Sequence, residues 1–206
     1  MTLSRRQVSR MLVLAGAAAA GGGALTLSGP AMAADYPKGD IVQGNPDASI
    51  EIIEYASMTC PHCRAFHETI YPRLKADWID TGKARFIFRE FPLDRYALQA
   101  SMLARCGGEA RFHGFIDLLF QQQSNWARAS DPTAALRQLG LMGGVSGEQF
   151  DACIGDESLV DMLLKTRLEG HEKMGVKGTP TVFINGEKVE DTGDYAAMND
   201  LLQSLM

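Results

Sequence analysis

The sequence feature that most constrains the fold is a pair of cysteines, Cys60 and Cys63, placed between two kinds of hydrophobic periodicity. Residues 50–55 have the short apolar pattern of a strand, whereas apolar residues after Pro61 recur at steps of four, as in a helix. Cys60 is therefore predicted to cap a helix N-terminus, with Pro61 at the first helical position, where its missing N–H costs nothing. Backbone N–H groups and the helix dipole stabilise an anion at such an end. The pair is a candidate reactive dithiol.

The chain around this pair predicts an α/β fold interrupted by helices. A second strand is expected at residues 85–91, and Pro72 is expected to kink the helix between the two strands. Residues 93–170 then show only helical periodicity, and strand character returns at residues 181–184. Without the helical block, the order is βαβ followed by ββα.

The two ends of this region carry weaker signals. Residues 34–48 contain several Pro and Gly residues and are interpreted as a loop. Asn185-Gly186 predicts a tight hairpin, and Asp194 is a plausible N-cap for a final amphipathic helix. The predicted divisions are a signal at residues 1–33, a first α/β part at 34–92, a helical insertion at 93–170 and a second α/β part at 171–206.

The first 33 residues have the pattern of a cleaved export signal. Three arginines, beginning at Ser4-Arg5-Arg6 as in a twin-arginine signal, precede an apolar stretch and the cleavage pattern Ala31-Met32-Ala33. An uncleaved anchor helix is the alternative, although glycines dilute the apolar stretch. The segment holds three of the 20 basic residues and none of the 25 acidic ones, so the remaining chain is more acidic than the whole, whose net charge is −5. Such a chain, without a basic run, is a poor candidate for binding nucleic acid.

His62, between the two cysteines, adds to the expected reactivity because it can give a hydrogen bond or a positive charge to a Cys60 thiolate. Cysteines at such sites have a pKa that is lower by roughly one to five units, which stabilises the reduced form by about 1–7 kcal/mol. Since about 30 mV corresponds to 1.4 kcal/mol, the disulfide becomes more oxidising by up to roughly 150 mV. A disulfide of this kind oxidises the thiols of other proteins to disulfides and is itself reduced.

Metal and haem binding fit the motif less well than redox chemistry does. A c-type haem site needs a histidine directly after Cys63, where this chain has Arg64. A zinc site would need further ligands, and His67 supplies at most a third one. A purely structural disulfide is the remaining alternative. No metal and no cofactor are expected.

The motif resembles the DsbA family of thiol oxidants. The family pattern is matched by Cys60-Pro61-His62-Cys63, by Glu54 six residues earlier, and by Thr179-Pro180, which corresponds to a cis-proline loop facing the disulfide. The resemblance implies a thioredoxin fold with an inserted all-helical domain. It also implies that Glu54 is a buried acid that carries the proton of Cys63, whereas the alternative is an exposed strand residue.

Two features depart from the best-known members of that family. Thr179 stands where those members have Val, and isomerases on the same fold have Thr, so the partner preference is open. Cys106 and Cys153 form an additional pair, and some relatives carry a second disulfide in the helical domain. Because both residues would enter an oxidising compartment, we expect a structural bridge between them, with two buried free thiols as the alternative.

The sequence therefore predicts a monomeric periplasmic dithiol oxidase. Its substrates would be reduced, unfolded exported proteins, and a quinone-linked membrane enzyme resembling DsbB would reoxidise it. An isomerase or reductase on the same fold and a redox-inactive peptide-binding chaperone are the alternatives. The remaining candidates are expected to be core or surface residues: His67, His113 and His171, and, with a substrate groove as the alternative, Met58, Phe91 and Met174.

Overall fold

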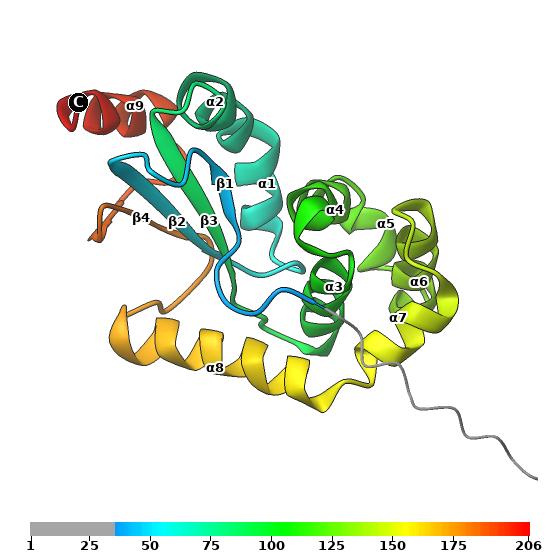
Figure 1. The fold of residues 1–206 in the computed structure, drawn as a ribbon. Coiled ribbons are helices and arrows are strands. Elements are labelled where there is room, and N and C mark those ends of the chain that lie inside the picture. Colours follow the sequence, from blue (N-terminus) through cyan, green and yellow to red (C-terminus); the bar gives the residue numbers. More distant parts are fainter. Residues whose placement is uncertain (1–35) are drawn as a thin grey trace, which may run out of the picture. The chain divides into compact units, whose positions relative to one another are not determined.

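A computed structural model describes residues 36–206, and the predicted export signal lies outside the described residues. The strands are β1 (Val42–Gly44), β2 (Ile50–Ala56), β3 (Ala84–Glu90), β4 (Thr181–Ile184) and β5 (Glu187–Lys188). The helices are α1 (Pro61–Thr69), α2 (Tyr71–Leu74), the π-helical turn η1 (Lys75–Ile79), α3 (Arg95–Cys106), α4 (Glu109–Gln121), α5 (Gln123–Trp126), α6 (Pro132–Met142), α7 (Gly147–Ile154), α8 (Glu157–Lys173) and α9 (Tyr195–Ser204). The fold is the predicted one, a thioredoxin fold with a helical insertion (Figure 1).

The five strands form one sheet in the order β1-β3-β2-β4-β5. β2 pairs in parallel with β3, and the other neighbours are antiparallel. The parallel pair needs a crossover, which α1, α2 and η1 supply. The turn between β4 and β5 uses Asn185 and Gly186, both at positive φ, as the sequence predicts.

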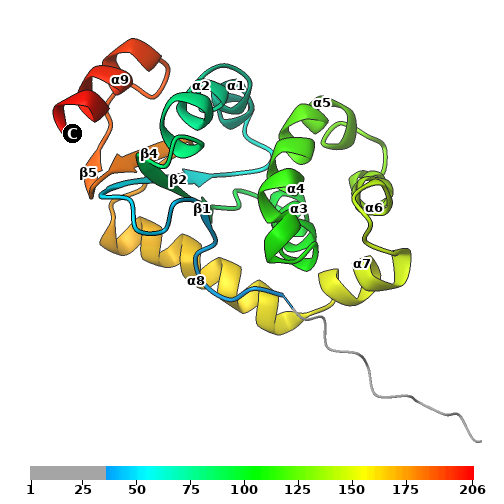
Figure 2. The same cartoon turned by 45° about the horizontal axis from the view of Figure 1, so that its top comes forward.

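Alternation along β2 divides the core between the two faces of the sheet. Ile52 and Ala56 belong to the cluster that includes residues of α1 and α9, whereas Ile53 and Tyr55 belong to a cluster on the opposite face. Helix α8 covers that opposite face, as Figures 1 and 2 show. The same alternation places Glu54 on the face of α1.

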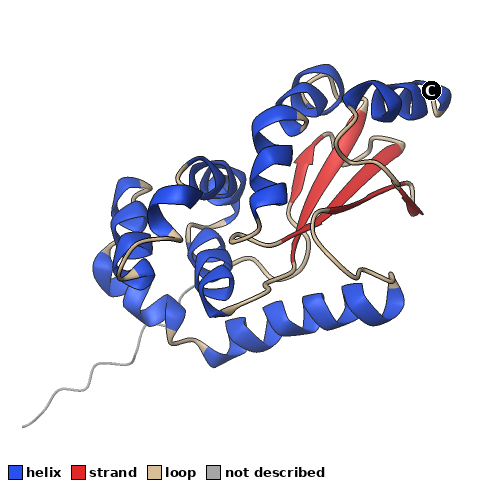
Figure 3. Ribbon diagram, turned by 180° about the vertical axis from the view of Figure 1, so that it is seen from behind, coloured by secondary structure: helices blue, strands red, loops and turns tan. Residues whose placement is uncertain are grey.

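The helical insertion shares its core with the sheet. Aromatic residues of α4 join the cluster that contains the β3 side chains Phe86 and Phe88. Helices α3 to α7 of the insertion lie beside the sheet rather than on either face of it (Figures 1 and 3). Four helices of the insertion, α3, α6, α7 and α8, begin at side-chain caps, including Asp131 before α6 and a capping box of Ser146 with Gln149 before α7, whereas α4 and α5 have none.

One local prediction is wrong, and another is confirmed. Residues 42–44 form an edge strand instead of a loop, because β3 supplies the hydrogen-bonding partner that a three-residue segment cannot provide for itself. The expected interruption of the helix near Pro72 is confirmed, since α1 ends at Thr69 and α2 begins at Tyr71. Pro72 cannot donate to the carbonyl of the residue four positions before it and clashes with that carbonyl, so the helix breaks ahead of the proline.

Candidate active site

The dithiol lies where β2 gives way to α1. Cys60 is the N-cap of α1, with φ of −76° and ψ of 120°, and a proline follows in the first turn. The loop before it is fixed by the insertion, because the side-chain amide of Gln123 in α5 donates to the carbonyl oxygens of Met58 and Cys60, at 2.9 Å each. Gln123 was not recognised from the sequence, since nothing local links it to a motif about 60 residues earlier.

The two thiols differ in environment. Cys63 is fully buried, whereas Cys60 keeps 7% of its surface exposed. The Cys60 sulfur lies 3.3 Å from the carbonyl oxygen of Thr179. A hydrogen bond from the Cys63 thiol, helped by Thr179 and by the backbone N–H groups of Cys63 and His62, lowers the pKa of Cys60 to about 5, against the opposing effect of burial. Cys60 is therefore a thiolate at neutral pH.

Cys63 is shifted in the opposite direction. Burial raises the pKa of its thiol far above the usual range, and the neighbouring Cys60 and the charge of Glu54 raise it further. The pair thus consists of one nucleophilic sulfur and one sulfur that holds its proton.

His62 contributes to the site through its backbone, whereas the sequence prediction concerned its side chain. Its contribution to the low pKa of Cys60 comes from the backbone N–H, and its side chain lines an open groove of about 340 Å³ beside the dithiol. The groove is also lined by Thr179 and Pro180, whose peptide bond is cis, by Phe66 of α1 and by Ile70, the C-cap of α1. Met58 and Phe91 are buried in the core and do not line it.

Glu54 is fully buried, and its carboxylate is paired. One carboxylate oxygen, Oε2, lies 2.8 Å from Nε2 of His67, which is buried as well. The sequence placed the two residues separately and gave His67 no role. Its position four residues after Cys63, on the same face of the helix, was the only available signal.

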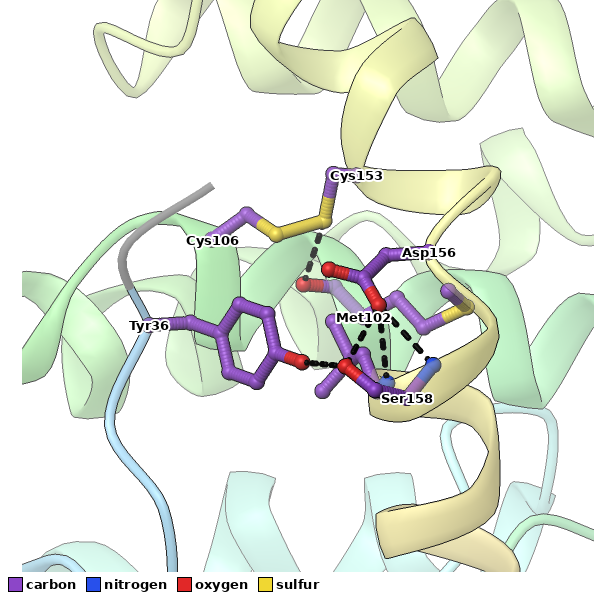
Figure 4. Close-up of a disulfide and its surroundings, with 7 residues drawn as sticks. Tyr36, Met102, Cys106, Cys153, Asp156 and Ser158 are labelled. Atoms are coloured by element: carbon purple, nitrogen blue, oxygen red, sulfur yellow. Dashed lines mark hydrogen bonds between the residues drawn. A yellow bond between two sulfur atoms is a disulfide. The ribbon is translucent and has the colours of Figure 1, made fainter. Parts of the chain in front are cut away.

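Cys106 and Cys153 form a disulfide between the end of α3 and α7, with their Cα atoms 6.2 Å apart (Figure 4). Tyr36 packs beside it and hydrogen-bonds the Ser158 hydroxyl, which in turn bonds Asp156, the N-cap of α8. The disulfide packs against apolar residues, among them Met102 of α3 and Leu159 and Leu163 of α8, and the Asp156 carboxylate that caps α8 lies nearby (Figure 4).

Residues 36–206 contain no group of side chains that could hold a metal ion, and His67 pairs with Glu54 instead of completing such a site. None of the helices in this region is long and apolar enough to span a membrane.

A thioredoxin fold with a dithiol at a helix N-terminus and a cis-proline opposite it defines the class of this protein. Residues 37–204 match the family model described as Thioredoxin. The chain aligns with the crystal structure of Wolbachia pipientis alpha-DsbA1 at a TM-score of 0.76 and 30% identity, over 82% of this chain and 92% of that one. The chain therefore belongs to the DsbA family of thiol–disulfide oxidoreductases.

The chain is also similar to two further proteins, one by sequence and one by structure. A putative protein-disulfide oxidoreductase of Rickettsia bellii is 37% identical over 153 residues, which are 74% of this chain and 59% of that protein. The chain thus spans less than two thirds of the length of the rickettsial relatives that it matches. The chain aligns with the crystal structure of oxidised BdbD from Bacillus subtilis at a TM-score of 0.73 and 21% identity, over 83% of this chain and 98% of the BdbD chain. At this identity the similarity supports the fold alone.

Proposed function

We propose that this protein is a dithiol oxidase that donates a Cys60–Cys63 disulfide to reduced exported proteins. The observation that carries the proposal is the low pKa of Cys60, about 5, beside a thiol whose pKa is raised. Stabilising the thiolate stabilises the reduced form, and a disulfide whose reduced form is stable is a strong oxidant. DsbA itself is the best-known example of this relation.

The reaction has two exchange steps. A substrate thiolate attacks the Cys60 sulfur of the disulfide, which forms a mixed disulfide and releases Cys63 as a thiolate that takes up a proton. A second thiolate of the substrate then attacks the substrate sulfur that is bonded to Cys60. This step forms the substrate disulfide and releases Cys60 as a stabilised thiolate. The substrate is oxidised by two electrons, and the Cys60–Cys63 pair is reduced by two.

The residues around the dithiol have distinct roles in this proposal. Pro61 and His62 set the helix N-terminus, and the groove beside His62 receives an extended substrate whose backbone lies along the cis-proline loop at Thr179 and Pro180. Glu54 exchanges the proton of Cys63, because its charge already acts on that thiol. Cys106 and Cys153 have a structural role.

The cellular setting is part of the same proposal. The protein is exported by the signal in residues 1–33 to the periplasm, where the second disulfide persists. A quinone-linked membrane enzyme resembling DsbB reoxidises it. It acts as a monomer, since one chain supplies both the dithiol and the cis-proline loop.

Thr179 supports a second candidate, a disulfide isomerase, because it precedes the cis-proline as in isomerases and lies against the Cys60 sulfur. One experiment separates the candidates. The oxidised protein is mixed with a reduced peptide that carries two cysteines, and the reduced protein is mixed with a protein whose disulfides are scrambled. An oxidase reacts rapidly in the first assay and weakly in the second. Efficient unscrambling with slow peptide oxidation would favour the isomerase, and no reaction in either assay would refute both.

A further inference from the structure

The buried carboxylate of Glu54 has one partnered and one unpartnered oxygen. Oε2 lies 2.8 Å from Nε2 of His67, while Oε1 has no hydrogen-bond partner among residues 36–206. An unpaired carboxylate oxygen in the core costs free energy, so its presence calls for an explanation. Here the carboxylate acts on Cys63, the thiol that must lose and regain a proton in each cycle.

His67 is held by aromatic rings in a fixed orientation. Its ring stacks on Phe120 at a centroid distance of 4.3 Å and lies 4.6 Å from the ring of Tyr71. With Nε2 directed at Glu54, the other ring nitrogen, Nδ1, lies on the side of Asp117. Nδ1 is buried, has no hydrogen-bond partner among residues 36–206, and lies 3.9 Å from Oδ1 of Asp117.

Asp117 brings this line of groups to the protein surface. It belongs to α4 of the helical insertion, and its side chain is 38% exposed. The distance of 3.9 Å between Nδ1 and Oδ1 is too long for a hydrogen bond but short enough for a small rotation of the exposed carboxylate to close it. Partial burial raises the pKa of Asp117, which brings it closer to neutrality, where a carboxylate exchanges protons more readily.

We propose that His67 is a positioning and proton-transfer residue that connects Glu54 to Asp117 and so gives the proton of buried Cys63 a path to solvent. The path runs from the thioredoxin part into the helical insertion. It rests on the proposed function, because only a cysteine that is oxidised and reduced in turnover needs such a path.

In this proposal, the Glu54–His67 pair carries two protons before and after each step. Both are on the His67 ring when Cys63 is a thiol, and one is on each residue when Cys63 is a thiolate. During reoxidation, Cys63 gives its proton to Oε1 of Glu54, while His67 gives its Nδ1 proton to Asp117 and keeps the one on Nε2. The Cys63 thiolate then attacks the Cys60 sulfur of the mixed disulfide and expels the partner's thiolate. During donation, Cys63 leaves as a thiolate and takes the proton back from Glu54, and His67 is reprotonated from Asp117.

Several ionisable groups surround this path and bear on its pH dependence. His113 in α4 stays neutral in the core, since burial lowers its pKa to about 4. Burial raises the pKa of the Tyr71 hydroxyl above its usual range, so it holds its proton. The groups that face His67 or Asp117 are Glu54 from β2, Tyr71 from α2, Lys75 from η1 and His113 from α4.

The test isolates the step in which Cys63 reacts. Reduced protein is mixed with glutathione disulfide, and samples quenched in acid are analysed by mass spectrometry for the mixed disulfide and the closed Cys60–Cys63 bridge. Formation of the mixed disulfide reports Cys60, and its closure reports Cys63. The variants are His67→Gln, whose amide can still donate to Glu54 but cannot transfer a proton, and Asp117→Asn, which changes only a half-exposed group.

We expect closure at pH 7 to slow about a hundredfold in His67→Gln, the lower end of the range for general acid–base catalysis. The effect of Asp117→Asn should be smaller, about tenfold, because water can also exchange protons at this half-exposed position. Formation of the mixed disulfide should change less than about twofold, and Asp117→Glu should restore most of the closure rate. One control variant should match the wild type: Glu68→Gln, an exposed acid of α1 that pairs with Arg64.

Unchanged closure in either Asp117→Asn or His67→Gln would overturn the path. Equal slowing of both steps would also overturn it, because a general disturbance of the site does not distinguish the two cysteines. If the wild type itself fails to react with glutathione disulfide, the proposed function fails first. If it reacts and the variants match it, the function stands and the path is wrong.

Discussion

The two cysteine pairs of this protein share a chain and differ in almost every physical property. Cys60 and Cys63 are three residues apart at a helix N-terminus, are free thiols, and have pKa values shifted in opposite directions. Cys106 and Cys153 are 47 residues apart, are joined, and lie in an apolar cluster between two helices. On the proposed function, the surroundings, and not the presence of a disulfide, decide whether a pair is reactive.

Each pair also stabilises something different. The surroundings of Cys60 stabilise its thiolate, and therefore the reduced state of that pair. The Cys106–Cys153 bridge closes a long loop and restricts the unfolded chain, which stabilises the fold. If this division is correct, changes at the first pair alter chemistry and changes at the second alter stability.

The largest effect is expected from Cys60→Ala. This variant cannot form the disulfide, so oxidation of a two-cysteine peptide should fall by more than about a thousandfold, to the uncatalysed rate. The matched variant, Cys106→Ala with Cys153→Ala, should retain activity within about twofold at a temperature where it is folded. Loss of activity in that folded double variant would mean that the second pair takes part in electron transfer.

The next effect concerns stability. Removing the bridge in the Cys106→Ala, Cys153→Ala variant should lower the free energy of unfolding by about 4 kcal/mol, the chain-entropy value for a loop of this length. Urea unfolding followed by circular dichroism measures the difference. Removing the active-site bridge by reduction should not have this destabilising effect at pH 7. If the double variant were as stable as the wild type, the bridge would not be structural.

A third prediction uses the pKa of Cys60, which falls from 9.0 to about 5 on folding. Because the folded pKa is the lower one, the stability gained by the reduced protein is complete above pH 9 and is lost as pH falls towards 5. At pH 7 the thiolate should contribute about 3 kcal/mol, from about two pH units at roughly 1.36 kcal/mol each.

The measurement compares reduced and oxidised protein by urea unfolding from pH 4 to pH 8. Groups that titrate equally in the reduced and oxidised proteins drop out of this difference. One of them is His113, whose buried neutral ring destabilises the fold below about pH 6.5. The difference in stability should shift towards the reduced form as pH rises from 5. A difference independent of pH would show that Cys60 has an ordinary pKa.

The smallest effect is expected from His62→Ala. His62 lowers the pKa of Cys60 through its backbone N–H, which alanine retains. The pKa of Cys60, followed by thiolate absorbance, should rise by less than about one unit, and the disulfide should become less oxidising by less than about 30 mV. A rise of several units would assign the stabilisation to the imidazole, as the sequence first suggested.

Local patterns were sufficient for much of the fold. The strand-to-helix junction at Cys60, the hairpin at Asn185-Gly186 and the cap at Asp194 each depend on a few adjacent residues, and each appears in the structure. The edge strand Val42–Gly44 could not be predicted in this way, because its existence depends on pairing with β3, which is distant along the chain.

The same limit applies to the candidate site. The acidity of Cys60 follows from the helix end, so the sequence was enough to predict its direction. The pairing of Glu54 with His67 depends on how α1 crosses the sheet, and the contact with Asp117 depends on where the insertion docks. Such contacts join residues whose neighbours along the chain carry no sign of them.

The reduction potential of the Cys60–Cys63 pair tests the central claim most directly. The protein is equilibrated with glutathione buffers at pH 7, and the reduced fraction is measured after alkylation. With a Cys60 pKa of about 5, the account predicts an oxidising pair, above about −180 mV and thus beyond protein disulfide isomerase towards DsbA. A potential near that of thioredoxin, about −270 mV, would mean that the pair reduces disulfides and would contradict the account.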